Sequence, residues 1–278
     1  FLDPYGGMLD LENKILRHVG SAFVEDPLRV LRGVQFLARF ELRIAEETRS
    51  LFKKINISCL PSERLFEEFK KLFLKSSKPS LGLRLMRECE MLDGFPELQA
   101  LIGVPQNKQW HPEGDVWDHT LLVMDQMAGL LTGDEEEDLV LMFAALCHDF
   151  GKPLSTTFQD GRWRSIGHSE LGVLPAQLFM KRLTSQKKLI EMVSLLVKEH
   201  LLPGLLYQSD KTTGVSDGAI RRLCLRVPVK LLLKLAKADH FGRTTQDALK
   251  KSFESGEWLE NRIKILNLEE NKPFPLLK

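Results

Sequence analysis

The sequence lacks several features that would place it in a common class at once. Its four cysteines are far apart and form no CxxC pair, which argues against a zinc ribbon or a disulfide framework. This cysteine usage indicates a reducing compartment, and we expect a cytoplasmic protein. No apolar run reaches the roughly 18 residues of a membrane span, and no signal peptide is recognisable. We therefore expect no membrane partner.

The chain also lacks an excess of charge of one sign. Lys and Arg number 39 against 38 Asp and Glu, so global charge does not favour nucleic acid, although composition cannot show a local basic strip. The 278 residues, 43% of them hydrophobic, suffice for one large domain or two ordinary ones with a real core. We expect a piece of a longer protein, because the chain opens on Phe1 and ends without a finished element.

Strand alternation is scarce, and helical periodicity predicts an all-α fold. Asp26 can cap a helix whose first position is Pro27. A strong apolar stripe at helical spacing follows after residue 61: Leu65, Phe66, Phe69, Leu72 and Phe73. A Gly- and Pro-containing loop near residue 105 predicts a domain boundary. We thus predict a first helical domain over 1–105, a second over 106–250, and a C-terminal helix and tail over 251–278.

Several local predictions can be tested by the structure. Asp115 or Asp118 should cap a helix, and 201–217 should be a loop. The Asp160-Gly161 pair predicts a small hairpin or an extended loop. One helix should run from about Gly167 to Leu183.

The pair His148-Asp149 is out of place at the end of an apolar helix pattern. A lone buried histidine needs only two hydrogen-bond partners, so His200 alone would be an ordinary core residue. Asp239, on an apolar stripe, could equally be explained by a salt bridge or a helix cap. The set is more informative, since its members lie near the ends of separate predicted helices: His119, His148, Asp149, His168, His200 and Asp239.

These residue types are suitable metal ligands. Imidazole and carboxylate suit Zn, Mn, Fe, Ni or Co, and carboxylates also hold Mg. Gly151 would let the backbone turn away after the pair, so that Lys152 could point toward an anion held by the metal. A divalent metal with an open position polarises a phosphoryl oxygen and lowers the pKa of its water to about 7. The pattern therefore predicts hydrolysis of phosphate esters, with Asp149 and Lys152 as catalytic residues.

The order His119, His148-Asp149, Asp239 resembles the signature of the HD metal-dependent phosphohydrolase superfamily. This resemblance implies that those four residues bind one divalent metal. Some members carry two further histidines for a second metal or for phosphate, and His168 and His200 fall where these are expected. It also implies activity on 2′,3′-cyclic phosphates or nucleotide phosphoesters. The other histidines, His18, His111 and His240, have no such place.

The segment from Glu25 to Arg32 resembles the EDxxR element of class II tRNA nucleotidyltransferases and bacterial poly(A) polymerases. The resemblance implies that Asp26 and Arg29, with Arg32 beside them, bind the base of CTP or ATP. It makes 1–105 the neck and body helices and tRNA or another RNA the partner. Taken with the HD signature, it indicates a CCA-adding enzyme that bears an HD domain, while CCA addition and poly(A) synthesis remain alternatives. The GS motif and DxD pair required for nucleotide transfer are absent, so we expect no transfer by this chain alone.

A non-catalytic RNA-binding module is the alternative function. The metal site would then be structural, and arginines would contact phosphates: Arg29, Arg32, Arg39 and Arg43. From spacing alone, a solvated helix face explains these arginines better than phosphate contact.

Overall fold

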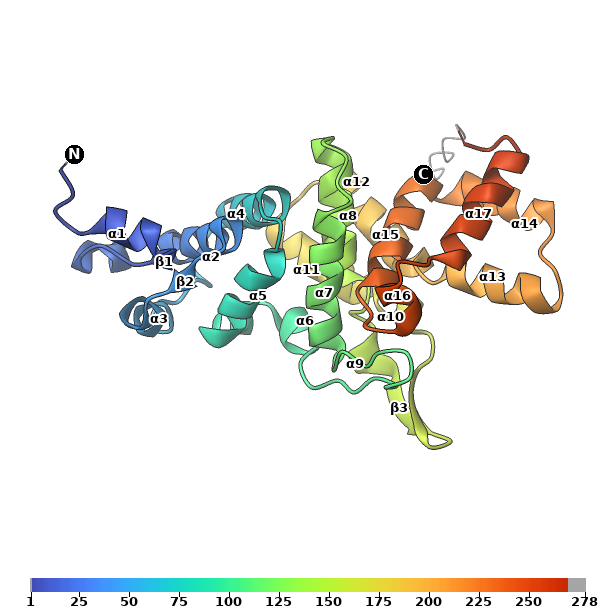
Figure 1. Cartoon of the computed structure of the whole chain (residues 1–278), viewed down its shortest axis with the longest axis horizontal. Helices are drawn as coiled ribbons and strands as arrows, with labels where there is room; N and C mark the ends of the chain where they lie inside the picture. Colours follow the sequence, from blue (N-terminus) through green and yellow to red (C-terminus); the bar gives the residue numbers. More distant parts are fainter. Residues whose placement is uncertain (1, 270–278) are drawn as a thin grey trace.

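The computed structural model describes residues 2–269, and it is an elongated array of helices (Figure 1). The N-terminal helices lie at one end, helices of the middle of the chain form the centre, and α13, α14 and α17 lie at the other end. The all-α prediction is confirmed. Within residues 2–269 the only sheets are two-stranded: β1 pairs in parallel with β2, and β3 pairs in antiparallel fashion with β4.

The first part of the chain contains short 3-10 turns as well as helices. Its elements are α1 (Gly7–Glu12), β1 (Ile15–Leu16), η1 (Ser21–Glu25), α2 (Leu28–Phe40), β2 (Arg43–Ile44), α3 (Glu46–Phe52), α4 (Ser62–Lys75), α5 (Pro79–Glu88), η2 (Met91–Gly94) and α6 (Pro96–Gln99).

The second part begins after a long irregular loop. Its elements are α7 (Val116–Ala128), α8 (Glu135–Cys147), α9 (Lys152–Ser155), β3 (Thr156–Gln159), β4 (Arg162–Ser165), α10 (His168–Leu171), α11 (Val173–Leu183), α12 (Lys187–Glu199), α13 (Leu202–Thr212), α14 (Asp217–Arg226), α15 (Val229–Phe241), α16 (Gln246–Leu249) and α17 (Glu254–Ile265).

The apolar stripe predicted after residue 61 is the buried face of α4. All five of its residues are at most 7% exposed, and α2 and α5 pack beside them. Helix α2 begins at Leu28, one residue later than predicted, yet the Asp26 carboxylate still accepts a hydrogen bond from the Leu28 N–H at 3.0 Å. The periodicity therefore located both helices and their buried faces.

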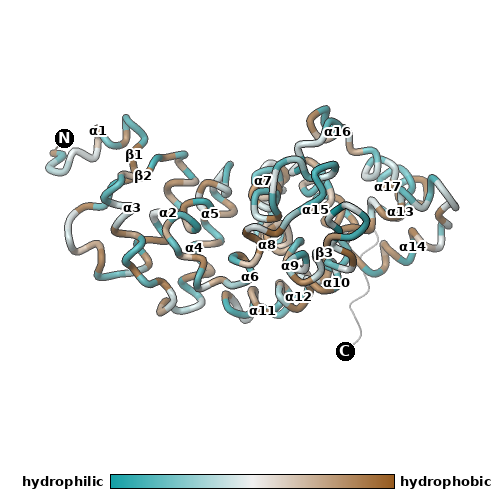
Figure 2. The backbone as a smooth tube through the Cα atoms, turned by 90° about the horizontal axis from the view of Figure 1, so that it is seen from below, coloured by the Kyte–Doolittle hydropathy of each residue, from teal (hydrophilic) through white to brown (hydrophobic). Residues whose placement is uncertain are grey.

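Aromatic stacking joins the first part of the chain to the second. Phe66 of α4 stacks on Phe143 of α8, with centroids 5.8 Å apart and planes 7° apart. Phe73 meets the same ring edge-on at 5.2 Å. Brown, hydrophobic segments accordingly run through both parts in Figure 2. Buried apolar contacts thus cross the boundary predicted near residue 105.

Caps and a turn fix three elements that border the site. Asp115 caps α7 by accepting from the Asp118 N–H at 2.9 Å, and Asp134 caps α8 in the same way at 3.0 Å. Asp160 and Gly161 have φ values of 49° and 74°, as a two-residue hairpin turn requires. The predicted hairpin is therefore β3–β4.

Two local predictions were wrong. The segment predicted as a loop over 201–217 contains helix α13. This helix has little buried apolar surface, so it shows no stripe, and polar contacts with α17 help to hold it: the Trp258 indole donates to Asp210 at 2.9 Å. The single helix expected up to Leu183 is divided at Gly172 into α10 and α11, where a Cβ would lie 3.0 Å from the Gly151 nitrogen.

None of the helices within residues 2–269 has the length and apolarity that a membrane span requires.

Candidate metal centre

The ends of several helices meet at one buried point. The six predicted ligands come from five elements and are at most 8% exposed: His119 on α7, His148 and Asp149 at the end of α8, His168 at the start of α10, His200 at the end of α12, and Asp239 in the last turn of α15. They span 120 positions of sequence, so only the tertiary fold brings them together.

Asp149 lies at the centre of this cluster. Its Oδ2 is 3.1 Å from His148 Nε2 and 3.9 Å from His119 Nε2, and its Oδ1 is 3.4 Å from His168 Nε2. Three groups of three have ligand atoms within 4.8 Å of one another. One of them, His111, Glu113 and His119, lies beside the cluster, and the other two contain Asp149: His119, His148 and Asp149, and Asp149, His168 and His200. One carboxylate thus belongs to both groups, which is the arrangement expected of two neighbouring cations.

Each of the four imidazoles uses Nδ1 for a hydrogen bond outside the cluster. The acceptors are Glu113 Oε1 for His119, Ala145 O for His148, Ser165 O for His168 and Val197 O for His200, at 2.7–2.8 Å. For His148, His168 and His200 a proton on Nδ1 leaves the Nε2 lone pair free, and this orientation is common for metal-binding histidines. The Nε2 atom of His119 is hydrogen-bonded to Asp239 in this structure.

The buried Nε2 atom of His148 makes no hydrogen bond, although it lies 3.1 Å from Asp149 Oδ2. Buried polar atoms of this kind are rare without a partner. A divalent cation held by His148 Nε2 and Asp149 would satisfy this nitrogen, so these residues fit the group that the sequence predicted.

Asp239 is part of the His/Asp cluster and also forms the kind of salt bridge that the sequence left open as an alternative. Its Oδ1 is 3.0 Å from His119 Nε2, and its Oδ2 accepts from Arg243 at 3.1 Å. The salt bridge is therefore present beside the cluster rather than instead of it. Arg243 lies one helical turn after Asp239, a spacing visible in the sequence.

Burial and charge set the protonation states. Burial lowers the pKa of His200 to about 3, helped by His168 and His148, so its imidazole is neutral at pH 7 as metal binding requires. Burial alone would raise the pKa of Asp149, but His148 and Lys152 outweigh it and hold that pKa well below its usual range. The centre thus carries an ionised carboxylate among imidazoles.

Lys152 is buried against the cluster. Its Nζ lies 2.7 Å from Asp149 Oδ2 and donates to Gln106 Oε1, also at 2.7 Å. In this structure the ammonium group therefore pairs with Asp149 while lining the cavity above it.

Gly151 has a different role from the one expected. Its φ of −85° is open to any residue, so glycine is not needed for the turn. A Cβ on Gly151 would instead lie 1.9 Å from the His168 carbonyl oxygen. Glycine is required because the backbone of α10 approaches this closely.

Glu113 was not predicted from the sequence as part of the site. Its side chain is 2% exposed, and Oε1 accepts from His119 at 2.8 Å and lies 2.9 Å from His111 Nδ1. Its Oε2 accepts from the Thr244 N–H at 3.2 Å. Glu113 stands in an irregular loop without periodicity, so the only available signal was its place between two histidines.

The predicted nucleotide-binding residues lie in a separate part of the molecule, at the start of α2 (Figure 1). Asp26 accepts from the Leu28 N–H and, through its other oxygen, from Arg64 at 3.0 Å. Arg29 donates to the Ala22 carbonyl, and Arg32 is exposed on α2. The structure therefore does not bring these residues to the His/Asp cluster.

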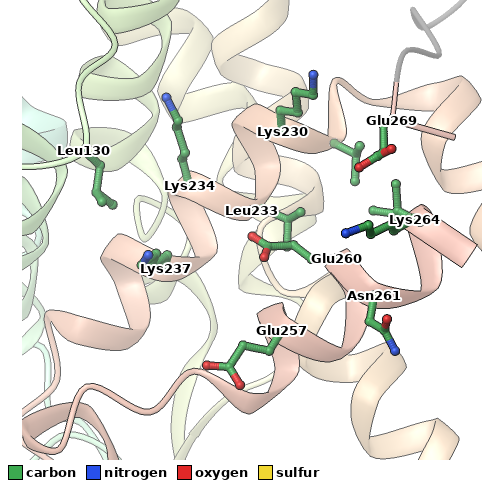
Figure 3. Close-up of a pocket in the computed structure, with 12 residues that line it drawn as sticks. Leu130, Lys230, Leu233, Lys234, Lys237, Glu257, Glu260, Asn261, Lys264 and Glu269 are labelled. Carbon is green, nitrogen blue, oxygen red and sulfur yellow. The ribbon is translucent and has the colours of Figure 1, made fainter. Parts of the chain in front are cut away.

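A cavity of about 710 Å³ lies between α15 and α17 (Figure 3). Lysines of α15 and glutamates of α17 line it, including Lys234, Lys237, Glu257 and Glu260. None of the predicted ligands is among its lining residues. The cavity at the His/Asp cluster is smaller, about 240 Å³.

Comparison with known families agrees with this geometry. Residues 116–248 match the family described as "HD domain", which contains all six predicted ligands. Residues 41–102 match the family described as "Probable RNA and SrmB- binding site of polymerase A". The fold and the site thus define an HD-domain protein with a polymerase-associated helical segment.

Curated relatives narrow the family further. A "Multifunctional CCA protein" of Stenotrophomonas maltophilia is 41% identical over 209 residues, which are 72% of this chain and 50% of the relative. One of Psychromonas ingrahamii is 33% identical over 286 residues, which are 98% of this chain and 66% of the relative. The chain belongs to the family of HD-domain-containing CCA-adding nucleotidyltransferases, and it spans about half the length of the first of these relatives.

Solved structures show the same fold. "The complex structure of CCA-adding enzyme with CTP" matches 95% of this chain and 53% of that chain with a TM-score of 0.53 at 16% identity. "Crystal structure of tRNA nucleotidyltransferase complexed with a primer tRNA and an incoming ATP analog" matches 96% and 66% with a TM-score of 0.51 at 18% identity.

Proposed function

We propose that this chain is the HD-bearing part of a CCA-adding tRNA nucleotidyltransferase and that its His/Asp cluster is a divalent-metal-dependent phosphohydrolase. The substrates would be 2′,3′-cyclic phosphates or nucleotide phosphoesters. The convergence of three Nε2 atoms on Asp149, those of His119, His148 and His168, with each Nδ1 already engaged, supports this proposal most strongly. Family membership is consistent with it but does not supply the hydrolytic activity.

The residues of the cluster would have separate roles in binding metal and phosphate. His119, His148, Asp149 and Asp239 would hold one cation, and His168 and His200 would hold a second together with Asp149. Bound divalent metal polarises the phosphoryl group and makes its water nucleophilic near neutral pH. Lys152 would exchange part of its contact with Asp149 for a phosphate oxygen, since ammonium groups bind phosphate as point charges.

The enclosed position of the cluster supports hydrolysis. Gln106 fixes Lys152 on one side, and Arg243 fixes Asp239 on another. The Gln106 amide and the Arg243 guanidinium group both line the cavity. Preorganised donors of this kind stabilise charge that develops on a phosphoryl group more effectively than water does.

The test is hydrolysis of 2′,3′-cyclic AMP with Mg, Mn, Ni, Co, Fe or Zn added, each in separate assays. We expect at least one metal to support turnover and Asp149→Asn to lower it by more than about a hundredfold, because several kcal/mol of charge stabilisation are lost. Asp93→Asn, a change at an exposed carboxylate of η2, is the matched control and should have no effect. Equal inactivity of wild type and the Asp149 variant with every metal would disprove the hydrolase.

A second candidate function is binding of tRNA or another RNA by the first part of the chain. The match of residues 41–102 to an RNA-binding family favours it. Asp26, Arg29 and Arg32 would bind the base of CTP or ATP in the full-length enzyme. Arg32 is exposed and free to reach RNA, whereas Asp26 would have to share its oxygen with Arg64.

Salt-dependent tRNA affinity tests this second function. Removing one phosphate contact, as in Arg32→Ala, should lower affinity and reduce the slope of log affinity against log salt by about 1. Arg221→Ala, at an exposed position of α14 outside residues 41–102, provides the control for charge alone. An unchanged slope in Arg32→Ala would argue against a phosphate contact at this residue.

A further inference from the structure

We propose that an aromatic rim at the mouth of the candidate metal centre, formed by Trp110, Phe158 and Trp163, holds the nucleobase of a nucleoside phosphate while its phosphate group lies at the His/Asp cluster. This inference rests on the proposed phosphohydrolase and identifies the residues that would hold the base of its substrate.

Two adjoining cavities provide space for the two ends of such a molecule. The cavity at the cluster has a volume of about 240 Å³, which suits a phosphate group and part of a sugar. A second cavity of about 580 Å³ shares Gln106, Asn107, His111 and Trp163 with it. These shared residues place the two cavities side by side, and the proposal is that one ligand extends across the partly exposed edge of Trp163 from one to the other.

The aromatic side chains on this wall are unusually exposed. Trp110, Phe158 and Trp163 are 53%, 60% and 38% exposed, whereas Trp117 on the neighbouring α7 is fully buried. Trp163 lines both cavities, Trp110 lines the smaller one, and Phe158 lines the larger. Exposed aromatic faces beside a phosphate site are the features that bind nucleobases by stacking.

The rim is held in place before any ligand arrives. Gln106 accepts from Lys152 and donates to the Asp115 carbonyl at 3.0 Å, which fixes the loop that carries Trp110. Phe158 and Trp163 are paired across the hairpin and meet edge-on at 5.1 Å. A preorganised platform loses little conformational freedom on binding.

Polar groups around the larger cavity are also suited to a base. Arg162 and Asn107 line it, and a nucleobase offers ring nitrogen and carbonyl acceptors to such donors. A phosphate ester without a base would leave the aromatic rim without a function. A free nucleotide and the last nucleotide of an RNA share the required chemistry.

The test compares substrates with and without a base. Wild type, Trp163→Leu and Trp163→Phe are assayed with 2′,3′-cyclic AMP and with glycerol 1,2-cyclic phosphate, using the metal that supports turnover. We expect Trp163→Leu to lower kcat/KM for the nucleotide by about 5- to 150-fold more than it lowers kcat/KM for the base-free substrate, mainly through KM. Trp163→Phe should restore most of the loss because it keeps an aromatic face.

Ile166→Ala is the matched control, because Ile166 is 69% exposed on the same segment and lines neither cavity. It should behave as wild type with both substrates. An equal loss with both substrates in Trp163→Leu, or no loss with either, would overturn the base subsite. A parallel assay with an oligoribonucleotide that ends in a 2′,3′-cyclic phosphate identifies the source: a Trp163 effect confined to the RNA assigns the site to RNA ends, and an effect on both shows that a mononucleotide suffices.

A binding measurement separates this proposal from the hydrolase itself. Quenching of tryptophan fluorescence by 2′-AMP, and its absence with glycerol phosphate, is expected in wild type and should be reduced in Trp163→Leu, where Trp110 is the remaining tryptophan of the rim. If no metal supports hydrolysis but this quenching is observed, the hydrolase fails and the base subsite stands. If hydrolysis occurs without any base-dependent quenching or Trp163 effect, the subsite fails and the hydrolase stands.

Discussion

Gly151 lies so close to His168 that a Cβ on the glycine would be 1.9 Å from the histidine carbonyl oxygen. The same carbonyl accepts the Gly172 N–H at 2.8 Å. The segment after the His148-Asp149 pair is thereby packed directly on the backbone of another predicted ligand. The spacing between the two halves of the cluster depends on this contact.

We therefore predict that Gly151→Ala moves α10 away and weakens binding of the second cation more than the first. Its cost in the free energy of unfolding should be at least the roughly 1–3 kcal/mol typical of overpacking. Urea denaturation measures this cost, and metal content after dialysis measures the loss at the site. Gly204→Ala is the control, since nothing lies within 4 Å of its Cβ position on α13. Full metal content in Gly151→Ala would show that α10 tolerates the shift.

Glu113 should act as a positioning residue through His119. We expect Glu113→Ala to lower metal affinity by about 10- to 100-fold, as is typical when a partner of a metal-binding histidine is removed. Glu113→Gln keeps an oxygen that can accept from His119 Nδ1 and should recover part of the affinity. Isothermal titration with Mn or Ni gives the affinities directly. Unchanged affinity in Glu113→Ala would mean that His119 is oriented by packing alone.

Thiol reactivity should distinguish the cysteines. Burial raises the pKa of Cys89 to about 11 and raises that of Cys147 well above its usual value, whereas Cys59 is exposed. A raised pKa keeps a thiol protonated to higher pH, so the reactive thiolate of Cys89 becomes abundant only as the pH approaches 11. At pH 8 we expect Cys59 to react with a disulfide reagent far faster than the buried thiols, and Cys59→Ser to abolish the fast phase. A fast phase that survives this change would show that a buried thiol opens.

The ion pair at Asp26 predicts a pH-dependent contribution to stability. The Leu28 N–H, and then Arg64, lower the pKa of this carboxyl group below its ordinary value. A lowered pKa stabilises the fold above the unfolded-state pKa, near 4, and that contribution is lost as the pH falls through the folded-state pKa.

Asp26→Asn should therefore cost less than about 1 kcal/mol at pH 7, because the pair is partly exposed, and nothing near pH 2. Urea midpoints of wild type and variant at both pH values measure the difference. A cost that is independent of pH would assign the effect to packing.

Periodic features were predictable from sequence, and irregular ones were not. The stripe of α4 and the cap at Asp115 follow from local spacing, and the structure confirms both. Helix α13 escaped prediction because it lacks a buried apolar stripe and is held by side-chain contacts with a distant helix. Local propensity carries no information about such partners.

The candidate site shows the same division. The placement of His148 and Asp149 at a helix end is a local pattern, and it predicted a cluster that the structure brings together. Glu113 and Trp110 lie in an irregular loop, and Phe158 and Trp163 lie in the β3–β4 hairpin. No periodicity in these segments marks the residues that face the cavity. Gly151 was expected to let the backbone turn, whereas its role is to allow close approach of the His168 backbone, and the sequence gives no sign of such a contact between distant segments.

The aromatic stack on α8 has a thermodynamic consequence. Phe143 is held by Phe66 and Phe73, and the same helix ends at His148, five residues or about 7.5 Å further along its axis. A shift of α4 relative to α8 would thus alter the position of His148. Linkage is reciprocal, so cations bound at the cluster would in turn make α4 harder to open, and slowed amide exchange in this helix on metal addition would record the coupling.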